Sequence, residues 1–199
     1  MARHLDSRPR STPRFLLRPF RRRDVGAMHE AVNVSLPDLS EWLPWAVGYE
    51  RGVAQRFIRE SAAAWSDGRA FDFAVRTHDD PDWHVGNVSV WWVSQQNHVG
   101  EIGYWVRSDM TGQGIGTEIT AKAMQIGFEE VGFHKIVLRI AVENVASEQI
   151  ARKLGYALEG TLRDEVKVGG TWLDHTAWSL LDREWWDQRA RLKAQGTLT

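Results

Sequence analysis

The residues best suited to chemistry in this chain are three glycines at alternate positions, Gly112, Gly114 and Gly116, within the segment Met110–Thr117. This segment follows a strand-like run that ends at Val106 and directly precedes a helix-like run. Glycine lets the backbone bend sharply and approach a ligand closely, and the first N–H groups of a helix attract anions because they lack partners within the helix. The spacing therefore predicts a phosphate-binding turn at a helix start.

Two common nucleotide-binding patterns do not fit this turn. A P-loop ends in Gly-Lys-Ser/Thr, whereas Thr117 follows Gly116 here with no lysine before it. A dinucleotide-binding fingerprint needs Gly-x-Gly-x-x-Gly early in a parallel β-α-β repeat, and this turn follows an antiparallel meander. The residues of the turn alone leave open a third interpretation, a glycine-rich helix start that binds nothing.

A second motif, the segment Asn144–Tyr156, lies about thirty residues downstream and ends in Leu154-Gly155-Tyr156. Taken together, the two motifs resemble the GNAT acetyltransferase family. In that family an Arg/Gln-x-x-Gly-x-Gly/Ala loop binds the pyrophosphate of acetyl-CoA, and an Asn-x-x-Ser/Ala segment forms the helix beside the thioester. The resemblance therefore implies acetyl-CoA as the ligand of the turn.

Further segments resemble the RimJ/RimL branch of that family, the ribosomal-protein N-terminal acetyltransferases. They are Leu17-Arg18-Pro19, Trp42-Leu43-Pro44-Trp45, Ile102-Gly103-Tyr104-Trp105 and Leu158–Arg163, and the match extends from Phe15 to Leu181. The resemblance implies direct transfer of an acetyl group to a primary amine. The preferred acceptor is the α-amine of a protein or peptide. A small-molecule amine is the alternative acceptor. A catalytically silent acyl-CoA-binding module and a cofactor-free interaction module are the alternatives of another class.

The residues implied to bind acetyl-CoA come from three segments. The backbone N–H groups near Tyr104 would meet the pantetheine and the thioester oxygen, and the side chain of Asn144 would bridge amide groups of the cofactor or cap its own helix. The full set is Tyr104, Trp105, Val106, Thr111, Gly112, Gln113, Gly114, Ile115, Gly116, Thr117, Asn144 and Ser147.

Two residues are predicted to act in catalysis. The resemblance implies that the Ser147 hydroxyl donates a hydrogen bond to the leaving thiolate. Glu101, on the strand before the turn, is predicted to be the base, with Asp164, Glu165 or water as rivals.

Two departures from the family pattern bear on these roles. Thr111 stands where many members carry Arg or Gln, so one donor to the phosphates is missing. Ala151 stands where many members carry a tyrosine that acts as the general acid, and a methyl group donates no proton.

Composition narrows the functional classes. The chain has 199 residues, a formal net charge of −1, seven histidines and no cysteine. The absence of cysteine excludes disulfides, thiolate nucleophiles and cysteine metal sites, and the histidines show no zinc-binding spacing. The balanced charge gives no general attraction to nucleic acid or membrane, and no apolar run is long enough to cross a bilayer. We expect a cytoplasmic protein that needs no metal.

The hydrophobic pattern predicts an α+β (mixed α/β) GNAT fold: a strongly twisted, mostly antiparallel sheet of about seven strands with helices on both faces. Strands are expected at 15–20, 71–76, 85–93, 101–106, 135–142, 157–168 and 172–181, and helices at 25–32, 53–65, from 115, 145–154 and 182–194. Asp24 is expected to cap the first helix, and a loop containing Pro37 to follow it. The strand at 135–142 is expected to be covered on both faces.

Two expectations concern the ends of the chain. Residues 1–13, rich in Arg, Ser and Pro, are expected to form a flexible tail before a single domain over 14–199 that includes a C-terminal helix. The adjacent Trp185 and Trp186 on that helix are a candidate homodimer interface.

Overall fold

One sheet of eight strands, in the order β1-β2-β3-β4-β5-β6-β8-β7, forms the centre of the computed structural model, which describes residues 5–198. Its strands are β1 (Arg10–Ser11), β2 (Phe15–Pro19), β3 (Ala70–Thr77), β4 (His84–Ser94), β5 (Val99–Val106), β6 (Lys135–Ala141), β7 (Ala157–Val168) and β8 (Thr171–Leu181). Only β5 and β6 pair in parallel. The predicted mixed, mostly antiparallel sheet is confirmed, and the two-residue β1 raises the strand number above the seven expected.

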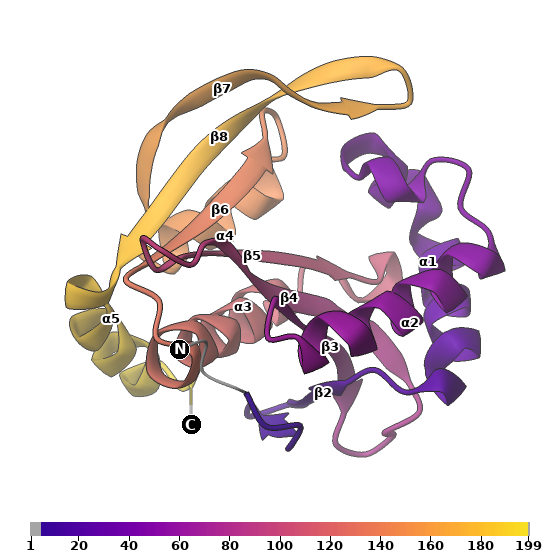
Figure 1. Cartoon of the computed structure of the whole chain (residues 1–199), viewed down its shortest axis with the longest axis horizontal. Helices are drawn as coiled ribbons and strands as arrows, with labels where there is room; N and C mark the ends of the chain where they lie inside the picture. Colours follow the sequence, from indigo (N-terminus) through magenta and orange to yellow (C-terminus); the bar gives the residue numbers. More distant parts are fainter. Residues whose placement is uncertain (1–4, 199) are drawn as a thin grey trace.

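Helices cover both faces of the sheet (Figure 1). They are α1 (Val25–Trp42), α2 (Arg51–Ser66), α3 (Ile115–Gln125, continued by a π-helical turn over Ile126–Val131), α4 (Val145–Lys153) and α5 (Asp182–Ala194), with short 3-10 turns η1 (Arg22–Asp24), η2 (Pro44–Ala46) and η3 (Ser108–Met110). Alternation along β5 divides the core in two. Ile102 packs in a cluster with Ile119 of α3, whereas Trp105 packs in a second cluster with Met28 and Ile58 of α1 and α2. Within residues 5–198, no helix has the length and apolar character needed to span a membrane.

Strands β5 and β6 stay together over only part of their length. They pair from Val99 to Glu101 against Lys135 to Val137, and then separate. Strand β6 pairs along its whole length with β8, so it follows β8 away from β5. The edge of β5 from Ile102 to Val106 therefore has no strand partner on this side, and its backbone polar groups are available to a ligand.

Helix α1 is longer than predicted. The sequence predicts a loop around Pro37, but the helix continues through this proline to Trp42. Proline removes one backbone hydrogen bond, at a cost of about 3 kcal/mol. The side chains of Val32 and Leu39 are buried on either side of the proline, and this packing holds the helix together.

Asp24 precedes α1, but its carboxylate does not cap that helix. It accepts hydrogen bonds of 2.7 and 2.8 Å from the Arg18 guanidinium and one of 2.7 Å from the Arg21 N–H, and it lies 3.1 Å from Nη2 of the buried Arg76. Burial alone would raise the pKa of Asp24, but these hydrogen bonds and positive charges lower it overall. Asp24 is therefore the centre of a buried ion cluster, and the predicted capping role is wrong.

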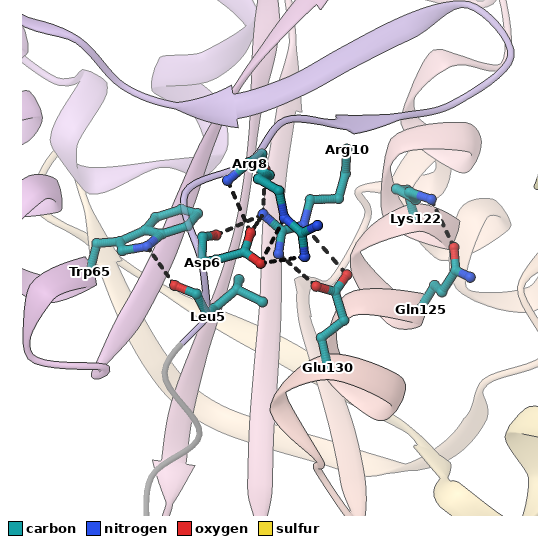
Figure 2. Close-up of polar contacts among 8 residues, drawn as sticks. All are labelled: Leu5, Asp6, Arg8, Arg10, Trp65, Lys122, Gln125 and Glu130. Carbon is teal, nitrogen blue, oxygen red and sulfur yellow. Dashed lines mark hydrogen bonds and ion pairs between the residues drawn. The ribbon is translucent and has the colours of Figure 1, made fainter.

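The segment from Leu5 to Arg10 packs against the rest of the domain, as Figure 2 shows. Leu5 is only 6% exposed, and its carbonyl accepts a hydrogen bond of 3.1 Å from Trp65 Nε1. Arg10, also buried, binds Glu130 at 2.6 Å, and strand β1 pairs with β2. Residues 1–4 of the expected tail lie outside the described residues, and residues 5–13 do not form one.

Strand β6 is covered on one face, not two. Ile136, Leu138 and Ile140 are buried, whereas the alternate residue Arg139 is exposed. The expectation of two covered faces is wrong because the opposite face of β6 borders the opening next to β5.

The two adjacent tryptophans of α5 have different environments. Trp185 is 1% exposed, stacks on Phe128 and donates a hydrogen bond of 3.0 Å to Glu129. Trp186 is 59% exposed. Of the pair expected at a dimer interface, only Trp186 is therefore accessible.

Candidate functional site

A cavity of about 580 Å³ opens where β5 and β6 separate. Its walls come from β5, β6, the glycine turn before α3 and the first turns of α4. Every residue expected to contact acetyl-CoA lines it, except Gln113. The Gln113 carbonyl instead accepts a hydrogen bond of 3.1 Å from Arg14. Segments separated by about forty residues thus meet at one site, although their binding of acetyl-CoA stays a prediction.

The glycine turn has the backbone shape that the sequence indicated. Gly112 and Gly114 have φ of +76° and +75°, values that L side chains rarely adopt. A Cβ on Gly116 would lie 2.7 Å from Ile150 Cδ1, so this glycine permits the close approach of α3 and α4. No side chain caps the N-terminus of α3 at Gly114. The first N–H groups of α3 are therefore free to bind an anion.

Arg14 fixes the outer side of this turn. Besides its contact with Gln113, its Nε donates a 2.6 Å hydrogen bond to Glu118, a buried residue in the first turn of α3. Glu118 also accepts hydrogen bonds from Thr12 Oγ1 at 2.5 Å and from the Arg14 N–H at 2.9 Å. The hydroxyl of Thr111 is bound to the Ser108 carbonyl at 2.9 Å. The cation nearest the turn is thus supplied by the segment before β2 and not by position 111.

Helix α4 presents its N-terminus to the cavity. Asn144 caps it: the Oδ1 atom accepts a 3.1 Å hydrogen bond from the Ser147 N–H, which confirms the capping interpretation of this residue. Both side chains line the cavity. Ala151, one turn after Ser147, is fully buried and does not line the cavity.

Glu101 lies in the cavity wall but is held by a guanidinium. Arg139 donates hydrogen bonds of 3.0, 3.2 and 2.6 Å to its carboxylate and one of 2.6 Å to Glu165. The hydrogen bonds to Glu101, and to a smaller extent the one to Glu165, raise the pKa of Arg139. Its guanidinium therefore stays charged. Neither Asp164 nor Glu165 is part of the cavity wall.

Nothing in the sequence indicated that His175 and Asp38 would line this cavity. His175 of β8 lies opposite Ala141, with its Nδ1 3.4 Å from the Leu173 carbonyl, and Asp38 of α1 binds the Ser108 hydroxyl. No local pattern marks either residue. His175 is placed by the pairing of β6 with β8, and Asp38 by the continuation of α1 beyond Pro37.

A second cavity of about 520 Å³ lies beside the first, on the side of α1 and α2. The two share Trp91, Gly103, Tyr104 and Trp105, all from β4 and β5, as well as Leu43. The remaining wall of the second cavity is largely apolar and aromatic, with a few polar side chains: Met28, Trp45, Tyr49, Val53, Arg56, Phe57, Glu60, Asn87 and Ser89.

Four tryptophans of α1, η2 and β4 differ in their relation to the two cavities. Trp42 lines the first cavity, Trp45 the second, and Trp91 both. Trp92 packs edge-on against Phe133 in the core, with ring centroids 4.5 Å apart.

Comparison with known proteins matches this chain to one family profile, described as an acetyltransferase (GNAT) domain, over residues 14–157. Among curated proteins, YdaF of Bacillus subtilis is 35% identical over 100 residues, which make up 50% of this chain and 55% of YdaF.

Two solved structures share the fold. RimJ of Mycobacterium smegmatis, in complex with CoA-disulfide, has 28% identity and a TM-score of 0.83, over 92% of this chain and 90% of that one. RimL, the ribosomal L7/L12 α-N-protein acetyltransferase, in complex with coenzyme A, has 20% identity and a TM-score of 0.78, over 85% of this chain and 95% of that one.

Proposed function

Because the chain belongs to the GNAT acetyltransferase family, we propose that it transfers an acetyl group from acetyl-CoA to the α-amine of a protein or peptide. The observation that carries the proposal is the separation of β5 from β6. It opens a cavity that extends from the glycine turn to Ser147, so one elongated ligand can contact both.

The residues present fit acetyl-CoA in both shape and chemistry. Two glycines with positive φ and an uncapped helix start offer N–H groups to a diphosphate. A Cβ on Gly112 would meet nothing within 4 Å, so there is space beside the backbone of the turn. The unpaired edge of β5 offers N–H and C=O groups to the amides of pantetheine, as an added strand would. Binding of a CoA compound by RimJ and RimL supports this assignment.

In the proposed reaction the amine attacks the thioester carbonyl directly. The backbone near Tyr104 would hold the carbonyl oxygen, and one such donor contributes about 3 kcal/mol to transition-state stabilisation. Ser147 would donate its hydroxyl proton in a hydrogen bond to the sulfur as the C–S bond breaks. The electron pair of that bond stays on sulfur, and the amine proton passes to the base.

The choice of an α-amine rests partly on the hydrogen bonds that Arg139 donates to Glu101. A lysine amine is neutral in about one molecule in 2,500 at pH 7, a cost of about 4.6 kcal/mol, whereas an α-amine costs only about 1 kcal/mol. Glu101 is bound by Arg139 and is suited to the smaller task, directly or through water. We therefore keep Glu101 as the proposed base, because its rivals Asp164 and Glu165 do not line the cavity.

The second cavity supports a peptide over a polyamine. Its walls are mostly apolar or aromatic, and its one carboxylate, Glu60, is accompanied by one guanidinium, Arg56. Such a wall suits an apolar side chain next to the amine better than a chain of ammonium groups. The likeness to the fold of RimL, which is named for an α-N-protein activity, agrees with this choice.

The test is release of free CoA thiol from acetyl-CoA with a panel of amines. We expect turnover with short peptides that carry a free N-terminus. The same peptides, blocked at the N-terminus and carrying one lysine, should be inactive, and kcat/KM should rise with pH up to about 8, where the α-amine loses its proton. Preference for spermidine would assign a small amine instead. Tight CoA binding without turnover on any amine would indicate a silent module.

A further inference from the structure

A second hydroxyl, that of Tyr104, lies beside Ser147 at the cavity. Along β5 the side chains of Ile102, Tyr104 and Val106 face the same core cluster, on the side of α3. The Tyr104 ring packs against the start of α3, because a Cβ on Gly116 would lie 3.7 Å from its Cε2 atom. The same Cβ would meet Ile150 of α4, and Ser147 lies one turn before Ile150 on that helix. Tyr104 and Ser147 both line the cavity, so the β5 phenol lies on the side of α4 that carries the Ser147 hydroxyl.

The Tyr104 hydroxyl is buried and has no hydrogen-bond partner among the described residues. A buried hydroxyl without a partner costs stability, so such a group needs a reason to be there. Burial raises the pKa of Tyr104 to about 12, and the neighbouring Ser147 hydroxyl lowers it by less. The two hydroxyls are therefore neighbours, although they do not yet meet the geometry of a hydrogen bond. The phenol stays protonated at neutral pH, so its O–H is present to donate a hydrogen bond to Ser147 Oγ.

We propose that Tyr104 is a positioning residue for acetyl transfer, and that its O–H donates a hydrogen bond to Ser147 Oγ when acetyl-CoA is bound. This contact directs the Ser147 proton to the thioester sulfur. The inference rests on the proposed function. It explains how the site works with a methyl group at Ala151, because the phenol comes from β5 instead of α4. Tyr104 remains neutral throughout: the C–N bond forms, the C–S bond breaks with its electron pair on sulfur, and the amine proton passes to the proposed base.

Tyr156 provides a matched control. Its hydroxyl is also buried and without a partner, and burial raises its pKa as well, but its side chain does not line the cavity. Tyr104→Phe and Tyr156→Phe therefore remove the same atom from two buried environments, close enough that Tyr104 contributes to the raised pKa of Tyr156, and only Tyr104 lines the cavity.

The experiment measures kcat and KM for Tyr104→Phe, Tyr156→Phe, Ser147→Ala and the Tyr104→Phe/Ser147→Ala double variant, with acetyl-CoA and a free-N-terminus peptide. We expect Tyr104→Phe to lower kcat roughly tenfold with unchanged KM values, and Tyr156→Phe to leave kcat within twofold. In the Ser147→Ala background the Tyr104 change should cost less than twofold, because the two residues act as a unit. The melting temperature of Tyr104→Phe should equal or exceed that of the wild type.

Three results would overturn the inference while the wild type remains active: an unchanged kcat in Tyr104→Phe, an equal loss in Tyr156→Phe, or a full tenfold loss in the Ser147→Ala background. A wild type inactive on every amine would remove the proposed function and the inference together. Should Tyr104→Phe fail to fold, 3-fluorotyrosine at position 104 preserves the ring and the donor. It should then retain at least the wild-type kcat, and a fivefold loss would contradict the inference.

Discussion

The two neighbouring cavities are built from different parts of the chain. We call the first, which we propose binds acetyl-CoA, the coenzyme end, and the second, which we propose binds the amine, the acceptor end. The coenzyme end consists of the glycine turn, the N-terminus of α4 and the free edge of β5, and it offers mainly backbone groups. The acceptor end, between α1, α2 and strands β4 and β5, offers aromatic side chains such as Trp45, Tyr49 and Phe57. A backbone site tolerates changes of side chain but not of backbone shape. A site made of side chains changes its specificity with each substitution.

The largest expected effect lies at Ser147, in the wall of the first cavity. Ser147→Ala should lower kcat about 100-fold and leave the KM values for acetyl-CoA and peptide within about twofold, because the lost hydrogen bond forms with the leaving thiolate. Steady-state kinetics of thiol release measure both. Ser147→Thr keeps the hydroxyl and should retain most of kcat. A 100-fold rise in the KM for acetyl-CoA with normal kcat would instead assign Ser147 to binding.

A change of backbone shape should damage the coenzyme end alone. Gly114→Val places a β-branched residue at φ +75°, a conformation that costs about 1–2 kcal/mol, and should raise the KM for acetyl-CoA roughly tenfold or more. The peptide KM and kcat should change little. Gly196→Val is the matched control, because Gly196 has φ +70° and lies far along the chain, after α5. An equal effect of both variants on the coenzyme KM would count against the phosphate site.

A change of side chain should damage the acceptor end alone. Trp45 is 37% exposed in the wall of the second cavity, with its ring centroid 6.2 Å from that of Trp105. Trp45→Ala should raise the KM for a peptide with an apolar first residue about fivefold, and the KM for acetyl-CoA should stay unchanged. A series of peptides with different first residues tests this directly. An effect confined to acetyl-CoA would place the amine elsewhere.

The smallest expected effect concerns the support of the glycine turn. Arg14→Ala removes the contacts to Gln113 and Glu118, and should raise the KM for acetyl-CoA about threefold, because the Arg14 side chain is 46% exposed and such ion pairs are weak. Arg8→Ala is the control: it removes an arginine whose side chain is 84% exposed, and it should leave the KM for acetyl-CoA unchanged. Equal KM values for the two variants would show that the turn holds its shape without Arg14.

The same contrast explains what could be predicted from the sequence. Positive φ at Gly112 and Gly114 and the cap at Asn144 are local properties, so contiguous motifs indicated them correctly. The pair of Arg139 with Glu101 depends on strand pairing across the sheet, and no spacing in the sequence reveals it.

The other residues that sequence reasoning missed or placed wrongly follow the same rule. Packing on both sides of Pro37 overrides a local helix-breaking signal, and Arg10 is fixed by a carboxylate 120 positions away, in Glu130. His175 enters the cavity only through the pairing of β8 with β6. Tertiary contacts, and not local patterns, decide the place of each of these residues.

The most direct test of the account is titration of the isotope-labelled protein with coenzyme A, followed through the backbone amide signals of residues 112–117. We predict large, saturable shifts of these signals, which Gly114→Val weakens at least tenfold and Trp45→Ala leaves intact. Amide signals of the turn that do not move at millimolar coenzyme A, or that move only together with those of the second cavity, would contradict the central claim that the backbone of this turn binds the diphosphate.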